Sequence, residues 1–148
     1  MSTASNKEIV RRYFSEVVDK RNADIIDELW TPDCVIHRPD GPTIIGLKEF
    51  KRGLKQRVLD VYSEFLTTIH DLIAEGDLVA CRLSHQAVHR GDWTSRLGCH
   101  AVAGRAVSWS SNTNFRFRDG KIAEEWVERD ELGMLIQLGV LAASGESK

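Results

Sequence analysis

The feature that most constrains the fold is a strand pattern that ends in a strong turn signal. From Ala106 to Arg118, apolar and polar residues alternate, and Asp119-Gly120 follows directly. Strand side chains alternate between the two faces of a sheet, and Asp-Gly is typical of a tight hairpin turn. The pattern therefore predicts an antiparallel hairpin whose second strand runs from Lys121 to Arg129.

More strands are expected before this hairpin, and helices before the strands. The strand patterns cover Cys34 to Arg38, Phe65 to Ala74, Leu78 to Val88 and Trp93 to Val102. Apolar residues at helical spacing predict helices over Ser5 to Val18, Asn22 to Trp30 and Leu47 to Tyr62, and a short last helix from Asp130 to Leu138. Helices and strands that are segregated in this way indicate an α+β fold. We expect the three N-terminal helices to cover a strongly curved sheet and to enclose a tapered apolar cavity, a usual ligand site.

Composition narrows the class of protein. The 148 residues suit a single domain over 1–148, with an ordered core at about 5–141 and a disordered tail. The net charge of −2 and the scattered basic residues argue against a nucleic-acid partner. No apolar run has the length of a membrane span, and no secretory leader is visible, so we expect a cytoplasmic protein with no membrane partner.

The cysteines do not indicate a metal site or a disulfide framework. Cys34, Cys81 and Cys99 are widely spaced, and none belongs to a CxxC pair. We therefore expect buried thiols and no bound metal.

Strand alternation separates an apolar face from a polar one. One apolar row contains Val79, Cys81, Leu83, His85 and Ala87, and a second contains Val107, Trp109, Ser111, Thr113, Phe115 and Phe117. We expect both rows to line the interior, with Ser111 and Thr113 as polar points in the second. The opposite face, rich in Ser and Asn, is a candidate surface for a homodimer.

Three residues are candidates for proton transfer. His85 is either a buried histidine with one backbone partner or a general base, because its ordinary pKa lies near neutrality. His37 is placed near the cavity mouth, since the loop Pro39-Asp40-Gly41-Pro42 follows it. Asp130 stands at a helix N-cap position, and it is also a candidate carboxylate at the cavity rim. The remaining histidines, His70, His89 and His100, are expected to be exposed.

Large aromatic residues are numerous enough to line a flat, apolar pocket. Such residues pack in the core by default, and they also form ligand walls. The candidate ligand-binding residues are Tyr13, Trp30, Trp109, Thr113, Phe115 and Trp126. Of Glu124, Glu125 and Glu128, one alternation class must face inward, and a carboxylate that shares the face of Trp126 would face a histidine across the cavity.

Several short motifs, in order, resemble those of the SnoaL-like polyketide cyclase family, within the nuclear-transport-factor-two-like superfamily. They are Asp33 with His37, Glu75-Gly76-Asp77-Leu78-Val79, Gly104-Arg105, Asp119-Gly120-Lys121-Ile122 with Glu124 and Trp126, and Asp130 with Gly133 to Gly139. The resemblance covers nearly the whole chain. It implies a cone-shaped α+β barrel, often a homodimer, with a small-molecule cavity and neither metal nor organic cofactor.

The resemblance also implies positions for the cyclase acid/base residues. The family's Asp follows the hairpin Asp by eight positions, and its His precedes it by six. Here these positions hold Val127 and Thr113, which do not exchange protons readily near neutral pH.

Two hypotheses about function remain. The first is a cofactor-free acid/base enzyme of the cyclase, isomerase, dehydratase or hydrolase type, which acts on a small apolar oxygenated substrate. The second is a non-catalytic ligand-binding or dimerisation module.

Overall fold

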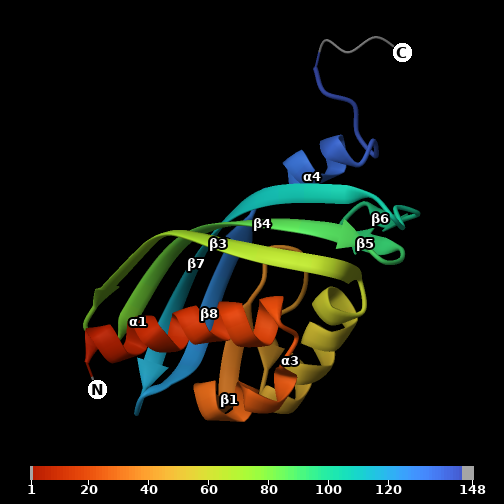
Figure 1. Cartoon of the computed structure of the whole chain (residues 1–148). Helices are drawn as coiled ribbons and strands as arrows, with labels where there is room; N and C mark the ends of the chain where they lie inside the picture. Colours follow the sequence, from red (N-terminus) through yellow and green to blue (C-terminus); the bar gives the residue numbers. More distant parts are fainter. Residues whose placement is uncertain (1, 145–148) are drawn as a thin grey trace.

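The computed structural model describes residues 2–144, so the expected disordered tail lies outside the described residues from position 145 onward. Helices and strands follow the order predicted for an α+β protein. Figure 1 shows the long strands curving over the N-terminal helices, so that α1 and α3 lie on the concave side of the sheet.

The three expected N-terminal helical regions are present, but their helices are irregular. Helix α1 spans Thr3–Arg12 and continues as the π-helical segment η1, Tyr13–Asp19. Ser2 caps α1 by accepting a hydrogen bond from the Ser5 N–H, so the helix begins before its predicted start at Ser5. The second helical region is a short turn, η2 (Ala23–Ile25) with α2 (Ile26–Leu29). The third, α3 (Leu47–Leu54), continues as η3 (Lys55–Leu59).

The main sheet has six strands in the order β2-β1-β8-β7-β4-β3. Their bounds are β1 Trp30–His37, β2 Ile44–Ile45, β3 Tyr62–Glu75, β4 Leu78–His89, β7 Ala106–Arg118 and β8 Lys121–Arg129. Strand β1 pairs with β8 in parallel, and the other neighbours are antiparallel. The β7–β8 hairpin turns at Asp119 and Gly120, both with positive φ, as the Asp-Gly signal predicts. Strand β1 begins four residues earlier than predicted, because Trp30 already pairs with Ile122.

Two small elements complete the chain. Strands β5 (Trp93–Ser95) and β6 (Gly98–His100) form a separate hairpin where one continuous strand was expected. Helix α4 (Glu131–Gln137) has Asp130 as its N-cap residue, as predicted. None of the helices within residues 2–144 has the length and apolar character needed to cross a membrane.

The two apolar rows predicted for β4 and β7 do face the helices. Val79, Leu83 and Phe115 are almost completely buried, and they pack with residues of η1, α2 and α3 in one hydrophobic core. A second core around Tyr62, Trp93 and Trp109 joins the sheet to α4. A cavity opens between these two packed regions.

Candidate functional site

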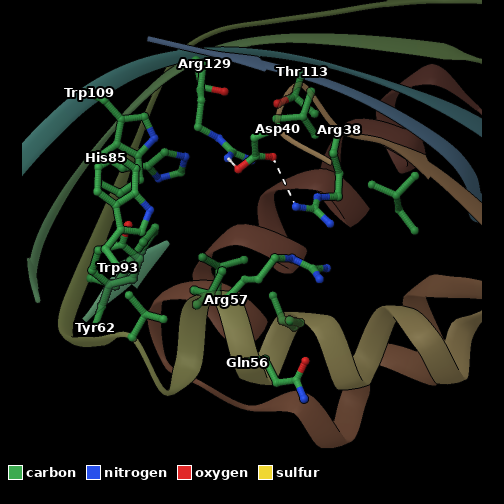
Figure 2. Close-up of a pocket in the computed structure, with 18 of the residues that line it drawn as sticks. Arg38, Asp40, Gln56, Arg57, Tyr62, His85, Trp93, Trp109, Thr113 and Arg129 are labelled. Atoms are coloured by element: carbon green, nitrogen blue, oxygen red, sulfur yellow. Dashed lines mark hydrogen bonds and ion pairs between the residues drawn. The ribbon is translucent and has the colours of Figure 1, made fainter. Parts of the chain in front are cut away.

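The cavity has a volume of about 420 Å³, within the range of small-molecule sites. Its walls come from strands β1, β3, β4, β5, β7 and β8, from the helical segments η1, α3 and η3, and from α4. Figure 2 shows His85, Trp109 and Tyr62 on one side of it and three arginine side chains reaching toward its centre. The predicted apolar cavity is therefore present, but its interior also carries charge.

Glu125 is the most unusual group in this interior. Its side chain is 5% exposed, lines the cavity, and has no hydrogen-bond partner among the described residues. Burial raises the pKa of this carboxyl to about 8, although the positive charge of Arg129 acts in the opposite direction. A carboxylic acid in this state is largely protonated at neutral pH.

A β-bulge explains why Glu125 faces inward. Phe117 pairs with Ile122, whereas the next β7 residue, Arg116, pairs with Glu124, so β8 contains one extra residue at Ala123. An extra residue shifts the alternation of every later side chain to the other face. Ile122 is buried on the inner face, and after the bulge it is Glu125 and Val127 that face the cavity, not Glu124 and Trp126.

A cluster of three charged side chains, Arg38, Asp40 and Arg129, connects the segment after β1 to the end of β8. The Asp40 carboxylate accepts hydrogen bonds from Arg38 at 3.3 Å and from Arg129 at 2.9 Å, with all three side chains largely buried. Burial acts to raise the pKa of Asp40, but the charges of Arg129 and Arg38 outweigh it and hold that pKa below its usual value. Asp40 is therefore ionised, in contrast to Glu125.

Arg57 is the third guanidinium of the cavity, and it comes from η3. It makes no hydrogen bond or ion pair with any residue between 2 and 144. Burial, and then the nearby charge of Arg38, lowers the pKa of Arg57 to about 10, so it remains charged at neutral pH. Figure 2 shows its guanidinium extending into the cavity below that of Arg38.

His85 is held by a chain of hydrogen bonds. The Thr67 hydroxyl donates to Asp19 Oδ1 at 2.7 Å, and the Thr67 backbone N–H donates to Asp19 Oδ2 at 3.0 Å. The Thr67 oxygen also lies 3.0 Å from His85 Nδ1. Because its own proton is already donated to Asp19, this oxygen accepts a hydrogen bond from the Nδ1–H of His85. This network assigns the Nδ1–H tautomer and leaves the Nε2 lone pair for another partner. Burial, and then the charge of Arg129, lowers the pKa of His85 to about 3 and keeps the ring neutral.

The structure corrects the predicted position of His37. This residue does not line the cavity but lies on the outer face of the sheet, where Nε2 is 2.6 Å from Glu124 Oε2. Trp126, predicted as a cavity wall, lies on the same outer face and stacks on His37 at 5.3 Å with a 13° interplanar angle. Trp126 was misplaced because the alternation pattern of β8 does not reveal its bulge. His37 was placed from the loop that follows it, but on β1 it is the neighbouring Ile36 that lines the cavity.

Three other candidate site residues, Asp130, Trp30 and Phe115, do not line the cavity. The Asp130 carboxylate caps α4 by accepting from the Gly133 N–H at 2.9 Å, and it does not line the cavity. Trp30 and Phe115 are completely buried in the core behind the cavity wall and do not line it. His89, expected to be exposed, is buried against Tyr62 and Trp93.

The structure does bring together four of the predicted residues. Tyr13, His85, Trp109 and Thr113 all line the cavity. Burial, and then the carboxyl of Glu125, raises the pKa of Tyr13, so its hydroxyl stays protonated.

Sequence reasoning missed Arg38, Asp40, Arg57 and Arg129, and it left the orientation of Glu125 open. Among the described residues, no three His, Cys, Asp or Glu side chains lie close enough together to hold a metal ion.

Comparisons with known proteins agree with this architecture. A model of the SnoaL-like polyketide cyclase family matches residues 8–138. A solved structure of AclR, a putative hydroxylase from Streptomyces galilaeus, is 23% identical, with a TM-score of 0.81 over 98% of this chain and 87% of that one. A putative polyketide cyclase from Acidithiobacillus ferrooxidans is 25% identical, with a TM-score of 0.75 over 96% of this chain and 100% of that one.

A third similar structure has another activity in its name. An LEH-like epoxide hydrolase from M. tuberculosis is 17% identical, with a TM-score of 0.72 over 93% of this chain and 92% of that one. The comparison with curated proteins found no significant match. Proteins of this fold thus carry names of several different reactions, so the fold alone does not identify the chemistry.

Proposed function

The chain belongs to the SnoaL-like polyketide cyclase family, and we propose that it is an enzyme that moves protons on a small oxygenated substrate with its own side chains. The observation that carries this proposal is Glu125, a carboxyl that lines the cavity and has no hydrogen-bond partner within residues 2–144. Burial raises its pKa to about 8, near neutrality. A group with such a pKa gives and takes back a proton at physiological pH more readily than an ordinary carboxyl.

Glu125 compensates for the missing family acid. The position that holds the acid/base Asp in the cyclases is Val127 here, and Glu125 lies two residues earlier on the same inward face of β8. A shift of two residues keeps a strand side chain on the same face and moves it about 7 Å along the cavity wall. The acid is therefore still available inside the cavity, at a different depth.

His85 has a different role from the one first assigned to it. A pKa of about 3 makes its ring a poor proton acceptor, but Nε2 carries a lone pair and Asp19 and Thr67 fix the tautomer. It suits a neutral partner that accepts a hydrogen bond from a substrate hydroxyl or a water. Trp109, beside it at 5.1 Å between ring centroids, would support a flat apolar substrate.

Proton transfer at carbon next to a carbonyl is the step that these groups support best. The ionised fraction of Glu125 takes the proton from carbon, and the negative charge that develops on the carbonyl oxygen lies in a cavity with a surplus of guanidinium groups. The proton then returns from Glu125 to another atom of the substrate. Cyclisation and isomerisation reactions share this step.

The experiment is exchange of hydrogen for deuterium beside the carbonyl of small bicyclic ketones such as 2-tetralone, followed by proton NMR in D₂O. We expect the protein to accelerate exchange above buffer, and Glu125→Gln to reduce this acceleration by about 10²-fold or more. Glu124→Gln is the matched control, because its side chain lies on the outer face of the same strand. Exchange that is as fast in Glu125→Gln as in the wild type would refute the role of Glu125.

A further inference from the structure

The positive charge in the cavity exceeds what its own carboxylates balance. Arg38, Arg57 and Arg129 line it, and Asp40 is ionised between the first and the third. Glu125 is largely protonated at neutral pH, and Asp92 is exposed at the rim. Asp40 neutralises one guanidinium and Asp92 offsets part of a second, so more than one positive charge is left for a bound anion to balance.

Two glycines make room for the arginines at the centre of this surplus. A Cβ added at Gly53 would overlap the guanidinium of Arg57, one helical turn later, and a Cβ at Gly41 would lie 2.7 Å from the nearest nitrogen of Arg38. Both guanidinium groups thus lie directly over backbone that has no side chain. Their placement depends on small residues as well as on charge.

The surroundings of Arg57 specify the rest of the ligand. Phe50, Leu54 and Arg57 follow one another at helical spacing along α3 and η3, and all three line the cavity. Ile44 lines it as well. An anionic group at Arg57 would therefore be attached to an apolar body, which is the chemistry of an organic acid and not of an inorganic anion.

We propose that the cavity binds a substrate that carries a carboxylate, with this group held between the guanidinium groups of Arg57 and Arg38 and its apolar body against Phe50 and Leu54. A guanidinium matches a carboxylate with two parallel hydrogen bonds, and Arg57 has its donors available. The bound anion would also remove the repulsion between the two arginines. This inference rests on the proposed function in treating the cavity as the substrate site.

The test compares acids with their neutral amides of nearly the same shape: benzoate with benzamide, cinnamate with cinnamamide, and 2-naphthoate with 2-naphthamide. Affinities are measured by isothermal titration calorimetry at pH 7 and low ionic strength. We expect at least one acid to bind about tenfold more tightly than its amide, which is the advantage of a charged hydrogen bond.

Two variants locate the preference. Arg57→Gln removes the charge, and Gly53→Ala leaves Arg57 in the sequence but fills the space that its guanidinium occupies. Arg57→Gln should abolish the preference for acids, and Gly53→Ala should weaken it by displacing the guanidinium. Arg82→Gln, on the outer face and paired with Asp71, should keep it. Acids that bind no better than amides in all three pairs, or a preference that survives in both variants, would overturn the proposal. Because this readout is binding and that for Glu125 is proton exchange, either proposal can fail without the other.

Discussion

Each face of the sheet carries a histidine and a glutamate, but the two pairs differ in burial and in whether the side chains contact each other. On the outer face, His37 and Glu124 contact each other at 2.6 Å, and their side chains are 37% and 29% exposed. On the inner face, His85 and Glu125 are less than a tenth exposed, and no hydrogen bond joins them. Glu124 and Glu125 are neighbours in sequence, so the local sequence does not explain the difference.

The comparison shows that burial, more than residue type, shifts the pKa of a side chain. Water solvates the outer pair, and ion pairs at such positions contribute little to stability. The inner groups lose that solvation, and each is driven to its neutral form. Neutral His85 can accept a hydrogen bond from a substrate, and Glu125, with a pKa of about 8, can both take and return a proton. The following changes test this contrast, from the largest expected effect to the smallest.

Glu125→Gln should make the protein more stable at neutral pH. The pKa of Glu125 rises from 4.5 to about 8 on folding, so its contribution to stability is fully present below pH 4.5 and is lost as the pH rises to 8. A neutral amide avoids this loss, which amounts to about 3 kcal/mol at pH 7. Urea unfolding at pH 4 and pH 7 measures it, and the gain should appear at pH 7 only. A variant that is destabilised equally at both pH values would contradict the expected protonation state.

His85→Gln should make the protein less sensitive to acid. The pKa of His85 falls from 6.5 to about 3 on folding, so its contribution is present above pH 6.5 and is lost as the pH falls toward 3. Between pH 7 and pH 5 this loss is about 2 kcal/mol in the wild type. The difference between the urea midpoints at the two pH values should shrink in the variant. An unchanged difference would mean that His85 is not held neutral by the fold.

Glu124→Gln should change little. It removes the partner of His37 on the outer face, and we expect a stability change of less than about 1 kcal/mol, which high salt reduces further. Thermal unfolding at low and high salt measures it. A loss as large as the effects at Glu125 and His85 would remove the contrast between the two faces.

The outer face also contains the surface that is predicted to form a homodimer. Ser108, Ser110, Asn112 and Asn114 are exposed there, as their alternation predicts. The dimer itself stays a prediction. Sedimentation velocity at micromolar concentration should show two copies, and a monomer alone would exclude it.

Most of the fold could be predicted from local patterns, and part of the site could not. The rows of β4 and β7 have unbroken alternation, which is why His85, Trp109 and Thr113 were placed correctly in the interior. On β8 a single extra residue reverses the alternation, and its sequence carries no signal of this. The three arginines and Asp40 come from a loop, a helix end and a strand end, so their meeting depends on the tertiary structure.

The most direct test of the central claim is the pKa of Glu125, read from the ¹³C shift of its side-chain carboxyl in an NMR pH titration. Comparison with Glu125→Gln assigns the resonance. We expect this carboxyl to remain protonated through neutral pH and to titrate near pH 8. A midpoint near 4.5, its ordinary value, would show that the cavity holds a solvated carboxylate, and it would contradict the proposed role of Glu125.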